Sequence, residues 1–275
     1  MSEALHPVML AVAPNGARKT RQDHPRLPVT PEELAQCAAD CVAAGASMLH
    51  LHVRDAAGRH SLDPADYRPA IDAIRARVGD ELLLQLTTEA GGRYAAREQM
   101  ASAEALAPEA LSIAIRELFA EDALHAEVAA FLSRLAARGA LVQYIVYSAD
   151  DVTRCARLQA EGAIPQAAPQ LLFVLGAYAE RRAGLPADLL PMLAALPSGW
   201  PWSACAFGPA ELRCVVAAAL LGGHVRVGFE NNLQLPSGAV AADNAALIGV
   251  TRDALLGLGM RQSTFAEARQ LLRGA

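Results

Sequence analysis

The 275-residue chain has little charge, and its positive charge is not concentrated anywhere. Lysine and arginine number 24 against 29 aspartates and glutamates, which gives a net charge of -5 with the basic residues scattered along the chain. Nucleic acids and anionic membrane surfaces attract proteins through clustered basic residues, so neither partner is expected. No apolar run approaches the roughly 20 residues that a membrane-spanning helix needs. The expected ligands are therefore small molecules.

Closely spaced cysteine pairs of the C-x-x-C type are also missing. The five cysteines are odd in number and are Cys37, Cys41, Cys155, Cys205 and Cys214. This pattern predicts free, buried thiols in a reducing compartment rather than a zinc knuckle or a redox site. The first ten residues lack a basic segment followed by an apolar core, so the cytoplasm is the predicted location.

Two nucleotide-binding signatures are absent as well. No G-x-G-x-x-G follows the first apolar run, and the phosphate loop G-x-x-x-x-G-K-[ST] does not occur. Short apolar runs instead alternate with helical segments, which is typical of repeated βα units. Eight runs are predicted strands: 7–12, 48–53, 82–88, 110–115, 141–148, 170–176, 200–207 and 224–230. Eight strands in about 250 residues predict an α/β protein with a (β/α)8 TIM barrel, more than a doubly wound open sheet.

Several helix starts are marked in the sequence. Thr30, Pro31 and Glu33 combine an N-cap, a proline at the first helical position and a glutamate that can close a capping box. Asp63 is a second N-cap followed by proline, and Thr264 opens a last helix. Without a linker or repeat, we expect one barrel domain over residues 1–275 that ends in a short C-terminal helix.

Two histidines, His50 and His52, stand one residue apart at the end of an apolar run. Since side chains alternate along a strand, both project to the same face, with their Cα atoms about 6.6 Å apart. Both rings can then reach one metal ion at the C-terminal rim of a barrel, where such folds place their chemistry. Two hydrogen-bonded interior histidines without a metal are the alternative.

A second strand, in the segment "GGHVRVGFENN" (222–232), can complete this set. Arg226, Gly228 and Glu230 are expected on one face, with Glu230 at the C-terminal end of the strand. In a closed barrel the last strand neighbours the first, which neighbours the second, so Glu230 can join the two histidines. Zinc with an open coordination position suits such a set, and Arg226 suits a substrate carboxylate. His224 lies deeper on the same face and is expected to be structural.

These segments resemble the β-keto acid cleavage enzymes, the group that includes 3-keto-5-aminohexanoate cleavage enzyme. The resemblance rests on "HLHVRDAAGRHSLDPADY", "LPVTPEELA", "GGHVRVGFENN", "APNGA", "LTTEAGG", "PEALS", "LPSGWPWS" and "EARQLL", in one order nearly end to end. It implies a zinc-dependent (β/α)8 enzyme that forms a homo-oligomer, a dimer or tetramer. Such an enzyme cleaves a β-keto acid with acetyl-CoA as co-substrate and yields acetoacetate and a new acyl-CoA.

The resemblance also implies roles for individual residues. The metal ligands would be His50, His52 and Glu230, and Arg226 would stabilise the carboxylate or the negative charge that develops. A metal beside a guanidinium places two positive centres where the enolate-like charge appears. The residues expected to contact substrate are Thr87, Thr88, Ser112, Asn15 and Arg18.

The proton acceptor is one point where this sequence departs from the family. Family members often read E-D-N, whereas this chain has Glu230, Asn231 and Asn232. An amide cannot take the proton that the matching aspartate is thought to take, so Asn231 alters the reaction or another group replaces it. Glu89, where the family more often has glycine, is the candidate catalytic substitute. Its alternative role is that of a solvated loop acid.

The substrate pocket departs from the family at two further places. Arg18 follows "NGA", where members that accept an amine would carry an acid. A cation disfavours an ammonium group, so we expect a β-keto acid without an amine, such as a keto diacid. A solvated loop arginine is the alternative. In the fifth strand, Gln143 and Tyr147 stand where the family tends to have glutamates and would reshape the pocket wall.

Two other functions fit part of the pattern. An amidohydrolase also opens a (β/α)8 barrel with H-x-H, but it needs histidines near the fifth and sixth strands and an aspartate on the eighth, which this chain lacks. A catalytically altered or inactive metal-binding relative that serves as a ligand-binding protein is the other, because a fold does not guarantee its activity. Asn231 is the residue that favours it.

Overall fold

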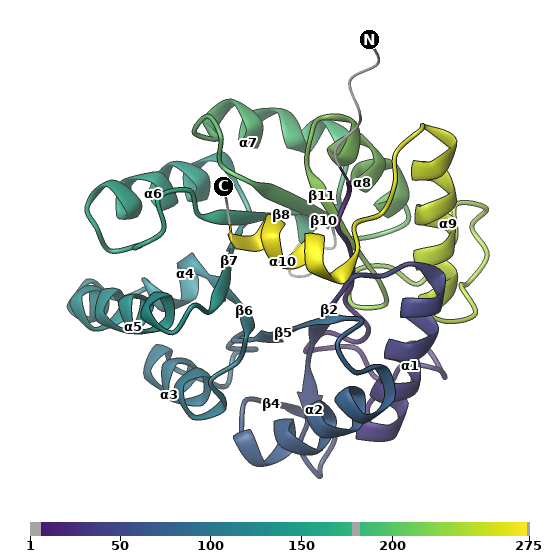
Figure 1. Cartoon of the computed structure of the whole chain (residues 1–275), viewed down its shortest axis with the longest axis horizontal. Coiled ribbons are helices and arrows are strands. Elements are labelled where there is room, and N and C mark those ends of the chain that lie inside the picture. The colour runs from purple at the N-terminus through teal and green to yellow at the C-terminus, as the bar shows by residue number, and fades with distance from the viewer. Residues whose placement is uncertain (1–6, 178–181, 274–275) are drawn as a thin grey trace.

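Eight parallel strands close into a barrel in the computed structural model, which describes residues 7–177 and 182–273 (Figure 1). The strands are β1 (Leu10–Val12), β2 (Met48–Leu51), β5 (Leu83–Thr87), β6 (Ala110–Ala114), β7 (Leu141–Val146), β8 (Gln170–Ala177), β10 (Trp202–Ala206) and β11 (His224–Val227). They follow the order β10-β11-β1-β2-β5-β6-β7-β8, and β8 pairs with β10 to close the ring. The prediction of a (β/α)8 barrel is confirmed.

Helices surround the barrel on its outside (Figure 1). They are α1 (Pro31–Ala44), α2 (Pro64–Val78), α3 (Ala96–Leu106), α4 (Ile115–Leu118), α5 (His125–Ala137), α6 (Ala149–Ala160), α7 (Leu189–Ala195), α8 (Glu211–Leu220) and α9 (Asn244–Gly257), with short 3-10 turns at Asp122–Leu124 and Pro186–Asp188. The predicted capping box is present at α1, because Thr30 Oγ1 accepts from Glu33 N at 3.3 Å while Glu33 Oε2 accepts from Thr30 N at 3.0 Å. Asp63 caps α2 by a single bond, with Oδ1 accepting from Ala65 N at 2.8 Å. None of the helices in the described ranges is long and apolar enough to cross a membrane.

The two predicted strands with expected metal ligands both end earlier than expected. The run that contains His52 leaves the barrel after Leu51, and β3 (Val53–Arg54) pairs instead with β4 (His60–Ser61) in a small antiparallel ribbon. The last strand ends at Val227, so the expectation that Glu230 lies on it is wrong. Gly228 has φ 141°, and a Cβ on it would lie 2.4 Å from the carbonyl oxygen of Ala13. This close approach of two backbones turns the chain out of the strand.

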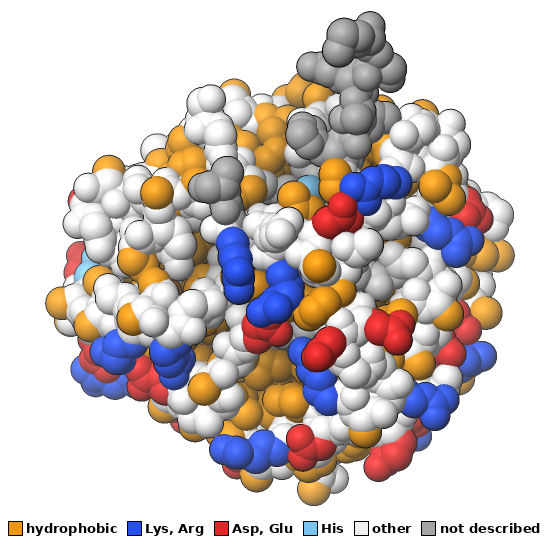
Figure 2. All heavy atoms as spheres, viewed as in Figure 1, with side chains coloured by type: hydrophobic (Ala, Val, Ile, Leu, Met, Phe, Trp, Pro, Cys, Tyr) orange, Lys and Arg blue, Asp and Glu red, His pale blue; other side chains and the backbone are white. Residues whose placement is uncertain are grey.

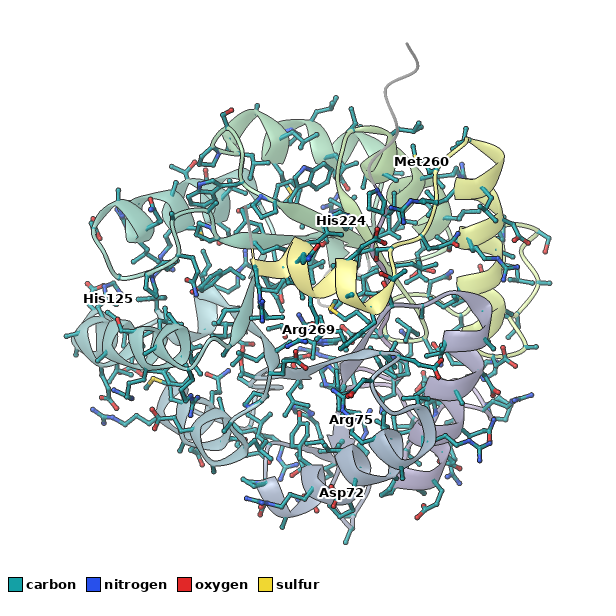
Figure 3. All side chains as sticks on the ribbon, in the orientation of Figure 1. Asp72, Arg75, His125, His224, Met260 and Arg269 are labelled. Carbon is teal, nitrogen blue, oxygen red and sulfur yellow. The ribbon has the colours of Figure 1, made fainter. Side chains whose placement is uncertain are left out.

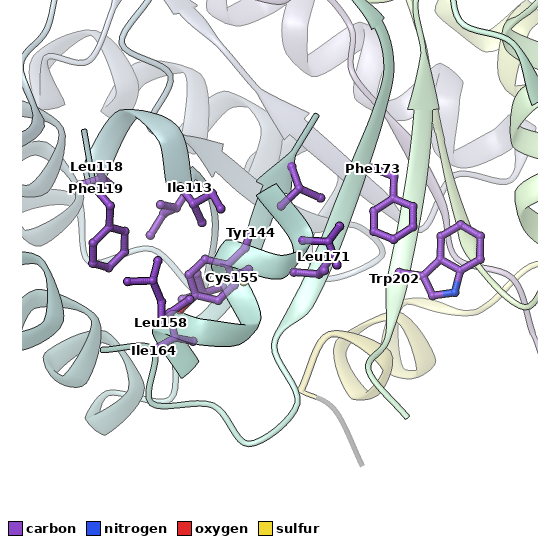
Figure 4. Close-up of a cluster of buried hydrophobic side chains, with 14 of the residues drawn as sticks. Ile113, Leu118, Phe119, Tyr144, Cys155, Leu158, Ile164, Leu171, Phe173 and Trp202 are labelled. Atoms are coloured by element: carbon purple, nitrogen blue, oxygen red, sulfur yellow. The ribbon is translucent and has the colours of Figure 1, made fainter. Parts of the chain in front are cut away.

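The layer between strands and helices is packed with apolar side chains. Figure 4 shows part of it, where Tyr144 and Ile113 from the strands meet Phe119 and Leu158. At its edge the ring of Trp202 stacks on Phe173 with centroids 5.0 Å apart. Trp200 and Trp202 are 9% and 5% exposed and belong to the barrel packing. All five cysteines are free thiols, as predicted, and only Cys37 is not fully buried.

The C-terminal helix α10 (Phe265–Arg273) lies across one end of the barrel (Figure 1). Its Ala268 and Leu272 pack on inward-facing residues at the start of the strands, namely Met9, Ala11, Met48, Leu83, Ala110 and Leu141. Arg269 of α10 and Arg75 of α2, both labelled in Figure 3, form ion pairs with Glu109. Figure 2 shows acidic and basic side chains interspersed on this face. Since α10 covers the N-terminal end of the strands, the opposite end is left for the site.

Candidate active site

Three buried side chains converge at the C-terminal end of the barrel. His50 Nε2 lies 3.0 Å from His52 Nε2, and Glu230 Oε2 lies 3.3 Å from His52 Nε2 and 3.7 Å from His50 Nε2. This is the one group of three or more potential metal ligands found within the described residues, with all ligand atoms within 4.8 Å of one another. Two imidazoles and a carboxylate at these separations fit a single divalent ion that keeps an open coordination position.

The protonation states of this cluster also suit a metal. Burial lowers the pKa of His50 to about 4 and that of His52 to about 3, so both rings are neutral near pH 7. Burial alone would raise the pKa of Glu230, but Arg226 and the two histidines hold it well below its ordinary value. A neutral histidine pair beside an ionised carboxylate is the state in which these groups bind metal.

The turn that follows β11 positions Glu230. Its backbone N donates to the Ala13 carbonyl at 3.0 Å, and its own carbonyl accepts from Lys19 Nζ at 2.6 Å. Beneath this turn, Glu211 of α8 is 2% exposed, with Oε1 accepting from Gly228 N at 3.2 Å and Oε2 from Asn232 Nδ2 at 3.1 Å. Contacts from Ala13, Lys19 and Glu211 therefore hold the turn in place.

Arg226 on β11 is buried next to Glu230. Its Nη2 donates to Glu230 Oε1 at 3.0 Å, to Cys205 Sγ at 3.2 Å and to Asn231 Oδ1 at 3.4 Å. Its Nε and Nη1 are buried and have no hydrogen-bond partner within the part of the chain that the structure describes. Burying such donors without an acceptor is costly, so these two N–H groups could bind an anionic group.

A pocket of about 1000 Å³, counted to its open mouth, joins these groups. Its lining includes His50, Glu230 and Arg226, together with an apolar wall of Ala114, Ile145, Val174 and Phe207. Arg18 and Arg116 are exposed at its edge, and the guanidinium carbon of Arg116 lies 4.2 Å from the centroid of the Tyr147 ring. The pocket can therefore hold a ligand with an anionic head, an apolar middle and a second polar end.

The expected substrate contacts do not all reach the pocket. Thr87 lines the pocket, with Oγ1 accepting from Glu89 N at 3.0 Å. Thr88, Ser112 and Asn15 are buried and do not line it. Thr88 Oγ1 donates to the Ser112 carbonyl at 2.9 Å. Contacts of these three side chains with substrate remain predictions.

Asn15 instead joins two loops that border the site. Its Nδ2 donates to the Pro28 carbonyl at 2.9 Å and to the His52 carbonyl at 3.2 Å. Both bonds reach backbone atoms, so the side chain fixes the path of the chain at His52. The "APNGA" segment pointed to Asn15 in the sequence, but it did not indicate the direction in which the amide points.

Glu89 lies in the pocket lining and is not a fully solvated loop acid. Its side chain is 28% exposed, and its Oε2 is 3.9 Å from His52 Nε2. Burial, together with the charges of Glu230 and Glu117, raises the pKa of Glu89 to about 7. Asn231 is 3% exposed, and its Nδ2 has no hydrogen-bond partner within the described residues.

Several residues at the site were not found from the sequence. Lys19 and Glu211 hold the Glu230 turn, His60 Nε2 contacts the Glu89 carbonyl at 2.7 Å, and Arg116 lines the pocket. An acid in the first turn of a helix ordinarily interacts with the helix dipole at the surface. Nothing in the segment around Glu211 distinguished it from that common case.

Several known proteins resemble this chain over nearly its whole length. The family model described as beta-keto acid cleavage enzyme matches residues 7–273. The 3-keto-5-aminohexanoate cleavage enzyme of Fusobacterium nucleatum subsp. nucleatum is 30% identical over 275 residues, which cover 96% of this chain and 97% of that protein. The 3-oxoadipate:acetyl-CoA acetyltransferase of Cupriavidus necator is 25% identical over 97% of this chain and 94% of its own length.

Solved structures show the same fold. The apo structure of ObcA superimposes with a TM-score of 0.68 at 20% sequence identity, over 90% of this chain and 65% of that one. At this identity the likeness concerns the fold alone. With a family model matched from end to end and a full-length relative at 30% identity, the chain belongs to the β-keto acid cleavage enzyme family.

Proposed function

We propose that this protein cleaves a β-keto acid with acetyl-CoA, giving acetoacetate and a new acyl-CoA, at the pocket built on His50, His52, Glu230 and Arg226. The observation that carries the proposal is the position of Arg226. Two of its N–H groups are buried without a partner in the described residues, beside a cluster that suits a divalent metal. An anionic substrate bound there meets two positive centres at once.

Each group then has a task in the reaction. A divalent metal, zinc in this proposal, would be held by His50, His52 and Glu230 and would polarise the keto group of the substrate. Arg226 binds the carboxylate or the negative charge that develops, and its contact with Glu230 Oε1 keeps its guanidinium in place. Thr87 orients the substrate from the neighbouring strand, with Thr88, Ser112 and Asn15 as the further predicted contacts.

Glu89 takes the proton that an aspartate at position 231 would take. It lines the pocket beside His52, whereas the Asn231 amide has no basic atom to offer. A carboxylate with a pKa near 7 is ionised often enough to act as a base and is basic enough to hold the proton. Asn231 retains a supporting task, since its Oδ1 accepts from Arg226 Nη2 at 3.4 Å.

The substrate in this proposal has no amine and carries an anionic tail, as in a keto diacid. Arg18 and Arg116 at the edge of the pocket support this, because a cation repels an ammonium group and attracts a carboxylate. The similarity to an enzyme named for 3-oxoadipate is in line with it. We further propose that the chain forms a homo-oligomer in the cytoplasm and that residues 1–275 make one domain, of which 1–6, 178–181 and 274–275 lie outside the described residues.

Release of acetoacetate tests the activity. Purified protein is given acetyl-CoA and a panel that includes 3-oxoadipate, 3-oxohexanoate and an amino-bearing β-keto acid, with and without prior chelation. We expect acetoacetate only with both metal and acetyl-CoA, and fastest with the diacid. An amino-keto acid as the best substrate would refute the assignment of Arg18.

A ligand-binding protein without turnover is the second candidate, favoured by the amide at position 231. The variant Asn231→Asp separates the two. If native protein releases no acetoacetate from any acid while Asn231→Asp does, the native protein is a binding relative and the cleavage proposal is wrong. If native protein is active, the binding-only function is excluded.

A further inference from the structure

A line of buried amide groups crosses the barrel interior below the pocket. It runs from His50 Nδ1 to Gln85 Oε1 at 2.8 Å, from Gln85 Nε2 to Gln143 Oε1 at 3.2 Å, from Gln143 Nε2 to Gln170 Oε1 at 2.7 Å, and from Gln170 Nε2 to Ser203 Oγ at 2.8 Å. All five side chains are at most 2% exposed. We call Gln85, Gln143, Gln170 and Ser203 the glutamine relay.

The strand alternation places the glutamine relay in a layer of its own. On β5, Gln85 stands between Leu83, which packs on α10, and Thr87, which lines the pocket. On β7, Gln143 stands between Leu141 and Ile145 in the same way. The relay therefore touches the pocket only through His50, and none of its four members lines it.

Each amide in the glutamine relay points the same way. A glutamine side chain accepts at its oxygen and donates at its nitrogen, and every oxygen here faces the His50 end while every nitrogen faces the Ser203 end. Ser203 Oγ ends the line as an acceptor. If Gln85 alone turned over, its oxygen would face the Gln143 oxygen, so it can turn only together with Gln143 and Gln170. In that reversed line the single hydroxyl hydrogen of Ser203 could not replace the two hydrogen bonds that Ser203 Oγ accepts, from Gln170 Nε2 at 2.8 Å and from Gln143 Nε2 at 3.4 Å.

This polarity fixes the proton on His50. Gln85 offers only an acceptor to Nδ1, so Nδ1 carries the hydrogen and Nε2 keeps its lone pair. Nε2 is the atom that faces His52 and Glu230. A histidine that binds metal through one ring nitrogen ordinarily donates from the other, and loss of that partner weakens metal binding.

We infer that the glutamine relay is a set of positioning residues that holds His50 in the Nδ1–H tautomer and so sets the affinity of the site for a divalent metal. The inference rests on the proposed metal site, but the tautomer itself exists without metal. Gln143, Gln170 and Ser203 do not line the pocket, and they act on His50 through Gln85.

The test reads the tautomer in metal-free protein and the metal affinity separately. Two-bond correlations between the ring protons and nitrogens distinguish the Nδ1–H form from the Nε2–H form, with His50 assigned by comparison with His50→Asn. We expect the Nδ1–H form in native protein and a shift toward Nε2–H in Gln143→Leu, because Gln85 then loses the acceptor that orients it. Competition with a chelator should show zinc binding weakened about 10- to 100-fold in Gln143→Leu.

Three further variants separate the relay from general damage to the core. Gln143→Glu still accepts from Gln85, so it should keep the native tautomer and affinity. Gln166→Leu removes a glutamine that accepts from Tyr144 Oη at 2.8 Å in the outer layer, and it should change neither readout. Ser203→Ala removes a single oxygen atom at the far end of the relay and should shift the tautomer in the same direction as Gln143→Leu. It provides the test if Gln143→Leu does not fold.

The outcomes distinguish the relay from the metal site. An Nε2–H form in native protein overturns the relay, whatever the measured zinc affinity. An unchanged tautomer in both Gln143→Leu and Ser203→Ala overturns it as well. Native protein with the Nδ1–H form but no zinc binding supports the control of the tautomer, and it refutes both the control of metal affinity and the proposed function. A loss of affinity in Gln166→Leu equal to that in Gln143→Leu would mean that both act through stability, which also overturns the relay.

Discussion

Replacing Arg226 with lysine should impair catalysis while leaving the metal in place. One nitrogen of Arg226, Nη2, donates to Glu230, Cys205 and Asn231. The other two, Nε and Nη1, are available to substrate. Lysine keeps the positive charge but has a single nitrogen. That nitrogen can bind Glu230 or the substrate, but it cannot bind both at the positions that the arginine nitrogens occupy. The variant therefore loses about one hydrogen bond to a charged group, worth about 1.5–3 kcal/mol.

That loss corresponds to a fall in kcat/KM of about 10- to 150-fold, since about 1.4 kcal/mol is tenfold. The assay is acetoacetate release at saturating acetyl-CoA with varied β-keto acid, together with the metal content of the purified variant. Arg134→Lys is the matched control, because Arg134 is an exposed arginine on α5 that pairs with Glu104. Native kcat/KM in Arg226→Lys, or loss of its metal, would refute the role given to this residue.

Three other predictions concern the proton acceptor, the Glu230 turn and the metal. Glu89 must be ionised to accept a proton, and its pKa is about 7, so activity should rise with pH through about 7. The variant Glu89→Gln should lower kcat by about 10²–10⁴-fold, and its pH profile should no longer show that rise. Gly228→Ala puts a Cβ 2.4 Å from the Ala13 carbonyl and should displace Glu230, so metal content should fall, whereas Gly238→Ala, with nothing within 4 Å, should bind metal normally. Chelation should lower the urea midpoint of unfolding and added zinc should restore it, since ligand at 100 times Kd contributes about 2.7 kcal/mol; an unchanged midpoint would count against a bound metal.

Much of the fold could be predicted because its signals are local. Caps such as Thr30 with Glu33 act within one turn of helix, and the eight apolar runs are each read within a few residues. The convergence of His50 and His52 follows from the two-residue period of a strand, which is local as well. The position of Glu230 was only partly predicted, because the strand ends where Gly228 meets Ala13, a residue more than 200 positions away.

The parts of the site that the sequence did not predict depend on contacts between strands. Thr87 and Thr88 are adjacent in one motif, and only the register of β5 decides which of them faces the pocket. The glutamine relay joins four strands through bonds that span 58, 27 and 33 positions. No spacing rule within one segment can show such a line, and a glutamine in a strand has no distinctive pattern of its own.

A crystal structure of the protein with zinc and a slowly reacting β-keto acid analogue tests the central claim most directly. We predict one metal ion bound by His50 Nε2, His52 Nε2 and a Glu230 carboxylate oxygen, with the carboxylate of the analogue on Nε or Nη1 of Arg226. Metal bound elsewhere, or an analogue that leaves Arg226 without an anionic partner, would contradict the account.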